Sequence, residues 1–391
     1  MPAIFQASTL VNATAREMWG ADATTVKDTS SLVDLGNRVF ASNTDKDKFL
    51  NTLVDRIKRT ALRTLDLSVE MPNLLLDSDS YFGILQKINV QPVATSTDNS
   101  WNIGEVDYTP TIWDIDKPNV SQKLFNNIST FTIPITIPDV MYKSAFFDGD
   151  LDKFVQAIFS TIESCLIMYV NGLTHLALCN LVAEKVKVNK AINMVVLYKA
   201  QFPDATIDGD SALTDKDFLR FAGMIIRNYI KYMANPSVLY NDEGMVRATA
   251  RDNMHVIMLS DFVSSFSTMY SSEVYWREIV ELPNFTEISY LQSPGNTNPT
   301  FATNSYFNII PASEKDEDEP TAIYGNGVFC ILADRQAIGV TLSEEWSGVD
   351  RNNRERYSNY TFGCNKGYFN DLSENVVVFY IADAPSDDNN G

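Results

Sequence analysis

Apolar residues recur at helical spacing along one long stretch of the chain, from Asp150 to Lys187. The turn signal Asp148-Gly149-Asp150 comes directly before the series, as expected at a helix start. Its apolar members are Leu151, Phe154, Val155, Ile158, Phe159, Ile162, Cys165, Leu166, Tyr169, Leu173, Leu176 and Leu181. The pattern predicts one amphipathic helix of about 55 Å, at roughly 1.5 Å per residue, with Gly172 as a point where it can bend.

The N-terminal part of the chain has a different composition and hydrophobic pattern. Residues 1–45 are rich in Thr, Asn, Ser and Ala and show little periodicity, which predicts an extended arm that packs only against another molecule. A helix is predicted over Phe49–Leu67, where apolar residues return at helical spacing. Its basic residues gather near the C-terminal half, where they favour the helix dipole: Arg56, Lys58, Arg59 and Arg63.

Between Tyr81 and Asn119 the pattern changes to short β-like pieces interrupted by prolines and a glycine. This predicts a long two-stranded hairpin with few internal contacts. Isolated hairpins are marginally stable in water, so we expect another subunit to cover its apolar residues. The residues expected in that contact are Trp101, Ile103, Val106 and Trp113.

The rest of the chain alternates strand and helix patterns. Phe131–Pro138 alternates apolar and polar residues and predicts a one-faced strand, which its prolines place at a sheet edge. A second helix is expected from Asp215 to about Met233, then a buried strand at Met254–Ser260 and a helix capped by Asp261. Leu291–Pro320 is expected to be an exposed insertion, and Val376–Tyr380 a central strand buried on both faces.

Composition narrows the classes of protein. A chain of 391 residues predicts at least two domains, and its 45% hydrophobic and 21% charged residues are typical of a folded protein. A net charge of -19 argues against a protein whose main function is to bind nucleic acid. No long uncharged apolar run predicts a membrane span, and the N-terminus does not resemble a secretory signal, so we expect folding in the cytosol.

Residues able to carry chemistry are few and scattered. The two histidines, His175 and His255, are expected to be buried without a catalytic role, and the four cysteines to be buried thiols. The familiar nucleophile, phosphate-binding and dinucleotide-binding motifs do not occur. An acidic group near residue 210 fails the calcium-loop pattern and is interpreted as a solvated loop: Asp204, Asp208, Asp210 and Asp215. We therefore assign no catalytic residue, no cofactor and no metal ligand.

The order of these segments resembles the capsid fold shared by tailed bacteriophages and the floor of the herpesvirus shell. Phe49–Ile57 and the segment beginning Phe154-Val155-Gln156-Ala157-Ile158 are similar to major capsid proteins of small podoviruses. Phe329–Val340 resembles the strand pair that leads from the axial to the peripheral domain, and Asn375–Tyr380 the last axial strand.

The resemblance implies an α+β fold with an N-terminal arm, an extended hairpin loop, a peripheral domain with a long spine helix, and an axial domain. The expected division is an arm and first helix at 1–70, a hairpin loop at 71–120, a peripheral domain at 121–212, and an axial domain at 213–335. A return through the peripheral domain follows at 336–370. The final axial strand and a disordered tail are expected at 371–391.

The implied function is that of a major capsid protein, a non-enzymatic subunit that self-assembles into an icosahedral or prolate shell around a double-stranded DNA genome. Implied partners are copies of the chain as pentamers and hexamers, a separate scaffolding protein, a portal at one vertex, and DNA held without sequence-specific contact; no membrane partner is expected. Assembly would occur in the bacterial cytoplasm and the product would be the virion capsid. The basic residues Arg56, Lys58, Arg59 and Arg63 either form a solvated face or line the inner surface against DNA.

Two other functions stay open on the sequence alone. A bacterial encapsulin nanocompartment uses the same fold, and a hydrolase with a site assembled from distant residues is a further alternative. Some relatives cross-link lysine to asparagine between subunits, and Lys87 and Lys117 are the candidate donors here, without an identifiable acceptor.

Overall fold

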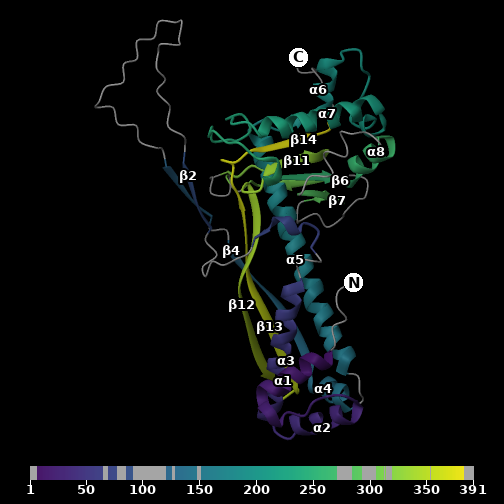
Figure 1. Ribbon diagram of the computed structural model, residues 1–391, viewed down its shortest axis with the longest axis vertical. Coiled ribbons are helices and arrows are strands. Elements are labelled where there is room, and N and C mark those ends of the chain that lie inside the picture. Colours follow the sequence, from purple (N-terminus) through teal and green to yellow (C-terminus); the bar gives the residue numbers. More distant parts are fainter. Residues whose placement is uncertain are drawn as a thin grey trace, which may run out of the picture. The chain divides into compact units, whose positions relative to one another are not determined.

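The computed structural model describes residues 7–64, 69–76, 85–90, 120–125, 128–147, 151–270, 284–292, 305–311, 313, 319–352 and 354–382 (Figure 1). They form two compact units, each assembled from distant parts of the chain. Unit 1 comprises residues 1–83, 128–174 and 340–368. Unit 2 comprises residues 84–127, 175–339 and 369–391. Helix α5 (Leu151–Lys187) and the strands β12 (Ile338–Asn352) and β13 (Tyr357–Asn370) run from one unit into the other.

Unit 1 packs helices against a four-stranded sheet. The sheet has the order β1-β12-β13-β4, with β1 (Leu75–Leu76) parallel to β12 and β4 (Ile128–Pro138) antiparallel to β13. Strand β4 lies at the edge, and its Phe131, Ile133 and Ile137 are buried whereas the alternate residues are exposed. The one-faced edge strand predicted from the alternating pattern is therefore confirmed. The helices of this unit are α1 (Ala7–Trp19), α2 (Thr29–Val39), α3 (Asn43–Thr64) and α4 (Asp139–Phe147), and the short 3-10 turns are Gly20–Asp22 and Pro72–Leu74.

The extended N-terminal arm is wrong for the described residues from Ala7 onward. These residues form α1 and α2, and Val11, Ala15, Leu35 and Val39 are fully buried in the core of unit 1. Helix α2 begins at a capping box in which the Asp28 carboxylate accepts from the Ser31 amide. The apolar positions of α1 and α2 are few and stand among many small polar residues, so the sequence pattern did not indicate a helix. A narrow apolar stripe is nevertheless sufficient for a helix that packs against a larger core.

The long helix α5 confirms the periodic pattern along its whole length. In unit 1 its Val155, Ile158, Ile162 and Leu166 belong to the same apolar core as residues of β4 and β13. The helix ends at Lys187, and the left-handed backbone of Asn189 (φ 53°) just beyond it allows the Lys190 amide to donate to the Lys185 carbonyl. The expected helix therefore exists as a continuous element with its N-terminal half packed in the core of unit 1.

Unit 2 is built on a five-stranded mixed sheet of order β5-β14-β11-β6-β7. Strand β14 (Val376–Tyr380) lies between two neighbours and is almost entirely buried, so the prediction of a central final strand is confirmed. The apolar core on one face of this sheet includes residues of α6 (Met194–Gln201), α7 (Lys216–Met233) and α8 (Ser260–Tyr270). The other strands are β5 (Ile192–Asn193), β6 (Met254–Leu259), β7 (Phe285–Ile288) and β11 (Val328–Asp334), and two 3-10 turns are Ala212–Thr214 and Arg251–Asn253.

The segment expected to be an exposed insertion also contains regular structure. Strands β8 (Leu291–Gln292) and β9 (Ser305–Ile309) join β10 (Ile323–Asn326) in a small sheet, and Phe307 is fully buried. Because prolines and acidic residues are frequent in this stretch, the sequence pattern did not indicate the two short strands β8 and β9. The expectation of a purely exposed loop is therefore wrong for the described residues.

Strands β2 (Leu85–Val90) and β3 (Val120–Phe125) pair antiparallel and form a separate two-stranded sheet. We call this pair the hairpin root. It confirms that the chain leaves and returns as antiparallel strands here, and the intervening residues 91–119 lie outside the described residues. The boundaries between the two units lie near residues 127 and 174, where β3 has ended at Phe125 and α5 passes from one unit to the other, and the finer division expected from the sequence stays a prediction.

Candidate functional site

The hairpin root has two faces of opposite character. In its register Lys87 stands opposite Lys123, and Ile88 stands opposite Gln122. Because side chains alternate along a strand, Lys87 and Lys123 share one face, while Ile88, Leu124 and Val120 share the other. The two faces therefore offer different contacts.

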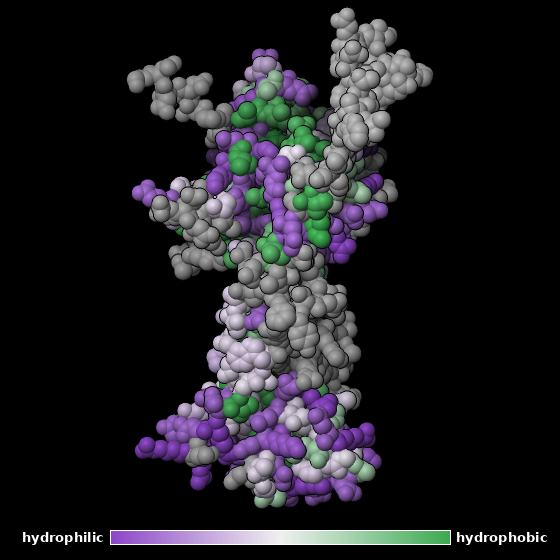
Figure 2. Space-filling model, turned by 90° about the vertical axis from the view of Figure 1, so that its left-hand side faces the viewer, coloured by the Kyte–Doolittle hydropathy of each residue, from purple (hydrophilic) through white to green (hydrophobic). Residues whose placement is uncertain are grey.

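The outer face of the root carries three exposed apolar side chains beside Gln86 and Gln122. Ile88 and Leu124 are each 62% exposed and Val120 is 55% exposed. Figure 2 views the side on which β2 lies and shows apolar side chains among hydrophilic ones on the surface. In the part of the chain that the structure describes, no other element covers these three side chains to the extent of burying them.

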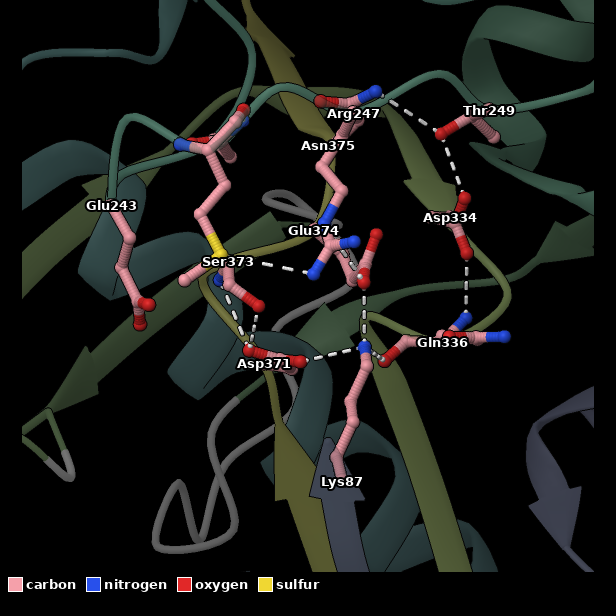
Figure 3. A network of polar contacts seen from close by, with 12 residues as sticks. Lys87, Glu243, Arg247, Thr249, Asp334, Gln336, Asp371, Ser373, Glu374 and Asn375 are labelled. Atoms are coloured by element: carbon pink, nitrogen blue, oxygen red, sulfur yellow. Dashed lines mark hydrogen bonds and ion pairs between the residues drawn. The ribbon is translucent and has the colours of Figure 1, made fainter. Parts of the chain in front are cut away.

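The inner face of the root joins unit 2 through a cluster of charges (Figure 3). The Lys87 Nζ atom lies 2.7 Å from Asp371 Oδ2 and 2.7 Å from Glu374 Oε1. The Lys123 Nζ atom lies 3.0 Å from Asp371 Oδ1 and also pairs with Glu243. One carboxylate, that of Asp371, thus binds both strands of the root.

Asp371 is fully buried, in the connection between β13 and β14. Burial by itself raises the pKa of its carboxyl group, but hydrogen bonds from Lys87, Ser373 and Lys123 outweigh this and hold the pKa at about 2. Asp371 Oδ1 accepts from the Ser373 amide at 3.0 Å and from the Ser373 hydroxyl at 2.7 Å. The carboxylate is therefore charged at neutral pH and fixed in place by its own turn.

The same connection extends the network to neighbouring elements. The Arg247 Nε atom lies 3.4 Å from Glu374 Oε1, and the Asn375 side chain donates to the Thr249 hydroxyl at 3.2 Å. That hydroxyl donates in turn to Asp334 Oδ2 at 2.7 Å (Figure 3). These contacts give partners to the Asn375 amide group and the Thr249 hydroxyl, both of which are buried next to the Asp371 connection.

A second buried charge group lies in unit 2, at the end of α5. The Lys185 side chain is fully buried, and its Nζ atom lies 2.9 Å from Asp242 Oδ1. Burial lowers the pKa of Lys185, and the neighbouring Asp242 carboxylate opposes that shift. The Asp242 amide donates to the Leu372 carbonyl at 2.9 Å. Leu372 directly follows Asp371, so this hydrogen bond connects the second charge group to the Asp371 network.

The residues expected at an interface are placed only in part by the structure. Trp101, Ile103, Val106 and Trp113 lie outside the described residues, as does Lys117. Lys87 lies at the hairpin root, and its ammonium group is ion-paired with Asp371 and Glu374.

The basic residues of the first predicted helix lie on α3 of unit 1. Arg56 forms an ion pair with Glu17 of α1. The side chains of Lys58, Arg59 and Arg63 lie outside the described part of the chain. Arg56 therefore has an ion-pair partner within its own unit.

The histidines and cysteines, the residues most able to take part in catalysis or metal binding, are mostly buried in the packed interior. His175 is buried and stacks on Tyr290, with ring centroids 4.9 Å apart. His255 is buried in β6, where burial and the charge of Arg335 lower its pKa to about 4. Cys179, Cys330 and Cys364 are buried, but Cys165 is only half-buried, so the expectation of four buried thiols is wrong for that residue.

The acidic residues near position 210 act in local turns. Asp208 accepts from the Ser211 amide at 2.8 Å, and Asp215 caps α7 by accepting from the Phe218 amide at 2.7 Å. Within the described ranges, no group of three or more His, Cys, Asp or Glu side chains is arranged to hold a metal ion.

One described helix segment, Lys153–Lys187 of α5, is long and apolar enough to cross a membrane. Of its most apolar window, 61% is buried inside the protein. A core helix of a globular protein meets the same criteria, because a helix apolar on most sides is normally buried.

Sequence reasoning missed the charge network at the root. Lys87 and Glu374 are 287 positions apart along the chain, and no motif links them. The available signal was indirect: both root strands carry a lysine among apolar residues, which indicates a charged partner in the folded protein.

Comparisons with known proteins agree with the expected class. The profile of the family described as Phi29-like phage major capsid protein matches residues 11–380. No curated protein sequence matches the chain.

Solved structures similar to this chain include one titled as the capsid structure of Staphylococcus phage Andhra, with 8% identity and a TM-score of 0.46 over 79% of this chain and 83% of that one. Another is titled as the head fiber and inner core protein gp22 of bacteriophage P68, with 9% identity and a TM-score of 0.45 over 78% and 83%. A third is the asymmetric unit of the bacteriophage PhiM1 mature capsid, with 7% identity and a TM-score of 0.39 over 79% and 84%.

The family match spans nearly all of the chain and confirms both the resemblance and the mixed α+β capsid fold stated from the sequence. It favours the phage shell over the encapsulin and hydrolase alternatives, because the matched family is one of phage capsid proteins. The chain belongs to the Phi29-like phage major capsid protein family, and it is a structural subunit that forms the capsid shell of a bacteriophage.

Proposed function

We propose that this capsid subunit joins its neighbours through the hairpin of residues 91–118, and that copies of it assemble as pentamers and hexamers into a closed icosahedral or prolate shell. The observation that carries the proposal is the exposed apolar face of the hairpin root, with Ile88, Leu124 and Val120 each more than half exposed. Apolar surface of this kind on a protein that assembles is best covered by a partner. Trp101, Ile103, Val106 and Trp113 would extend the same contact along the hairpin.

The two compact units would have separate roles in this shell. We assign unit 1, with the N-terminal half of α5 and the long strands β12 and β13, to the peripheral domain. Unit 2, with its five-stranded sheet, would be the axial domain. Sheet and helix order along the chain support this division, since the final strand β14 returns to unit 2.

The remaining partners follow from the same role. The shell would enclose double-stranded DNA without sequence-specific contact, and the net charge of -19 supports a wall that does not adhere strongly to DNA. Arg56, Lys58, Arg59 and Arg63 would be its local basic contacts on the inner surface. A separate scaffolding protein and a portal at one vertex would direct assembly in the bacterial cytoplasm. The subunit would act without catalysis, cofactor, metal ion or membrane.

Removal of the hairpin tests this proposal. Replacing Pro92–Asp116 with a short Gly/Ser linker leaves the sheets and helices of both units in place, so the subunit should remain folded. Assembly should fail, because the variant lacks the residues expected to contact a neighbour. Circular dichroism and sedimentation velocity on the same sample measure both properties.

A matched control keeps the hairpin and replaces an exposed residue elsewhere, such as Lys231→Gln on α7, which should fold and assemble normally. Normal shells from the linker variant would rule out the hairpin contact. Global unfolding of that variant would instead mean that the hairpin belongs to the core of the subunit.

A further inference from the structure

The hairpin root is attached to the rest of unit 2 by side chains and not by a shared sheet. Its two strands pair only with each other among the described strands. A lone two-stranded sheet has little stability of its own, so its direction depends on the contacts that its side chains make. These contacts include the ion pairs of Lys87 and Lys123 and a ring contact of Phe125 with Phe369 at 5.3 Å.

The two lysines form an unfavourable pair that needs a counter-charge. Lys87 and Lys123 stand directly opposite each other in the register, and like charges at such positions destabilise a strand pair. Each lysine binds a different oxygen of the Asp371 carboxylate, at 2.7 Å and 3.0 Å. The Asp371 carboxylate thus offsets the repulsion between the two lysines and connects both strands of the root to one residue.

The Asp371 residue is itself held in position by hydrogen bonds. The Asp371 amide donates to the Ala337 carbonyl at 2.7 Å, and Asp371 Oδ1 accepts two hydrogen bonds from Ser373. The side chain is fully buried, so the carboxylate has little freedom to follow a moving hairpin. The flexible lysine side chains must therefore adapt to Asp371.

We propose that Asp371 is a positioning residue for assembly: by binding Lys87 and Lys123 together, it sets the direction in which the hairpin leaves unit 2. Glu374 and Glu243 each bind one of these lysines and support the arrangement, but Asp371 alone bridges the two strands among the described contacts. The link to hairpin direction rests on the structure of unit 2. The link to assembly rests in addition on the proposed contact of the hairpin with a neighbour.

The test measures hairpin direction and assembly separately. Spin labels are placed at the exposed positions Gln122 and Asn235 of the full-length subunit, in a background with Cys165→Ala so that only these sites react. Asp371→Asn keeps the shape of the side chain but removes its charge. It should broaden the distance distribution measured by pulsed electron paramagnetic resonance. Assembly of the unlabelled proteins, followed by light scattering, should slow by about tenfold, the size expected when hydrogen bonds to a charged group are lost.

Non-additivity separates positioning from a local structural role. In a background carrying both Lys87→Gln and Lys123→Gln, the distances should already be broad, and Asp371→Asn should change neither distances nor assembly further. If Asp371→Asn fails to fold, the double lysine variant by itself carries the test, because Lys87 and Lys123 belong to the root and not to an apolar core. The exposed control Lys231→Gln should leave both measurements unchanged.

Unchanged distances in Asp371→Asn, or in the double lysine variant, would overturn the positioning role. An equally large effect of Asp371→Asn in the double lysine background would also overturn it, because the residue would then act through its Ser373 turn. Broader distances with normal assembly would overturn the assembly role and count against the hairpin contact itself.

Discussion

Burial and hydrogen bonding act on the Asp371 carboxyl group in opposite directions, and hydrogen bonding from Lys87, Ser373 and Lys123 is the stronger effect. A fully buried carboxylate without partners would be protonated or would destabilise the fold. Here its pKa falls from an ordinary value of 3.8 to about 2, so the charged form is favoured in the folded protein. This shift links the network to the stability of the subunit.

The pH dependence of stability should show this link. Because the folded pKa lies below the unfolded value, Asp371 contributes stability above about pH 4, and that contribution is lost as the pH falls through about 2. The loss should amount to roughly 2 to 3 kcal/mol, because a pKa difference of one corresponds to about 1.4 kcal/mol. Urea unfolding of the wild type and Asp371→Asn between pH 2 and 6 measures it. The difference between the two proteins should shrink on acidification, and a difference independent of pH would contradict the assignment.

Sequence reasoning at this scale identified the residue types but not their partners. His175 and His255 were expected in packed positions, and both are buried. Asp371 and Glu374 carried no recognisable signal, and the lysines of the root strands indicated a charged partner without saying which, because an ion pair between residues hundreds of positions apart depends on the final topology. Local patterns contain no information about which distant strands meet.

Among the elements, those with strong periodicity were predicted well. Helices α5 and α7 and the strand β4 follow apolar patterns with the period of their element, and the short, β-branched apolar run of β14 is typical of a strand buried on both faces. Helices α1 and α2 were missed because their apolar stripe is narrow and many of their other positions are Thr, Ser and Asn, which are weak helix formers. Tertiary packing against unit 1 supplies the stability that local preference lacks.

Helix α5 provides a direct test of the packing in unit 1. Ile162 is fully buried among apolar residues of the core, so Ile162→Asp would place an unpaired carboxylate there. The cost should be several kcal/mol, about 4, and soluble protein should largely disappear.

The same change at an exposed position of the helix is the matched control. Met168 is 74% exposed on α5, so Met168→Asp should express and melt almost as the wild type does. Thermal melting of the soluble fractions compares the two variants. Normal expression and melting of Ile162→Asp would mean that this face of α5 is not packed in the core.

At the scale of the whole molecule, each compact unit is assembled from three separated parts of the chain. Segment order was sufficient to indicate the capsid family, and the family match over residues 11–380 agrees with it. The unit boundaries were less predictable, because α5, β12 and β13 cross them without any change in pattern. A continuous helix gives no sequence signal at the point where its packing partners change.

Electron microscopy of the purified full-length protein, assembled with its scaffolding protein, tests the central claim most directly. A shell-forming subunit should produce closed particles of uniform size, or pentamers and hexamers when assembly is incomplete. A discrete monomer that persists at high concentration in the presence of the scaffold, without particles or rings, would contradict it.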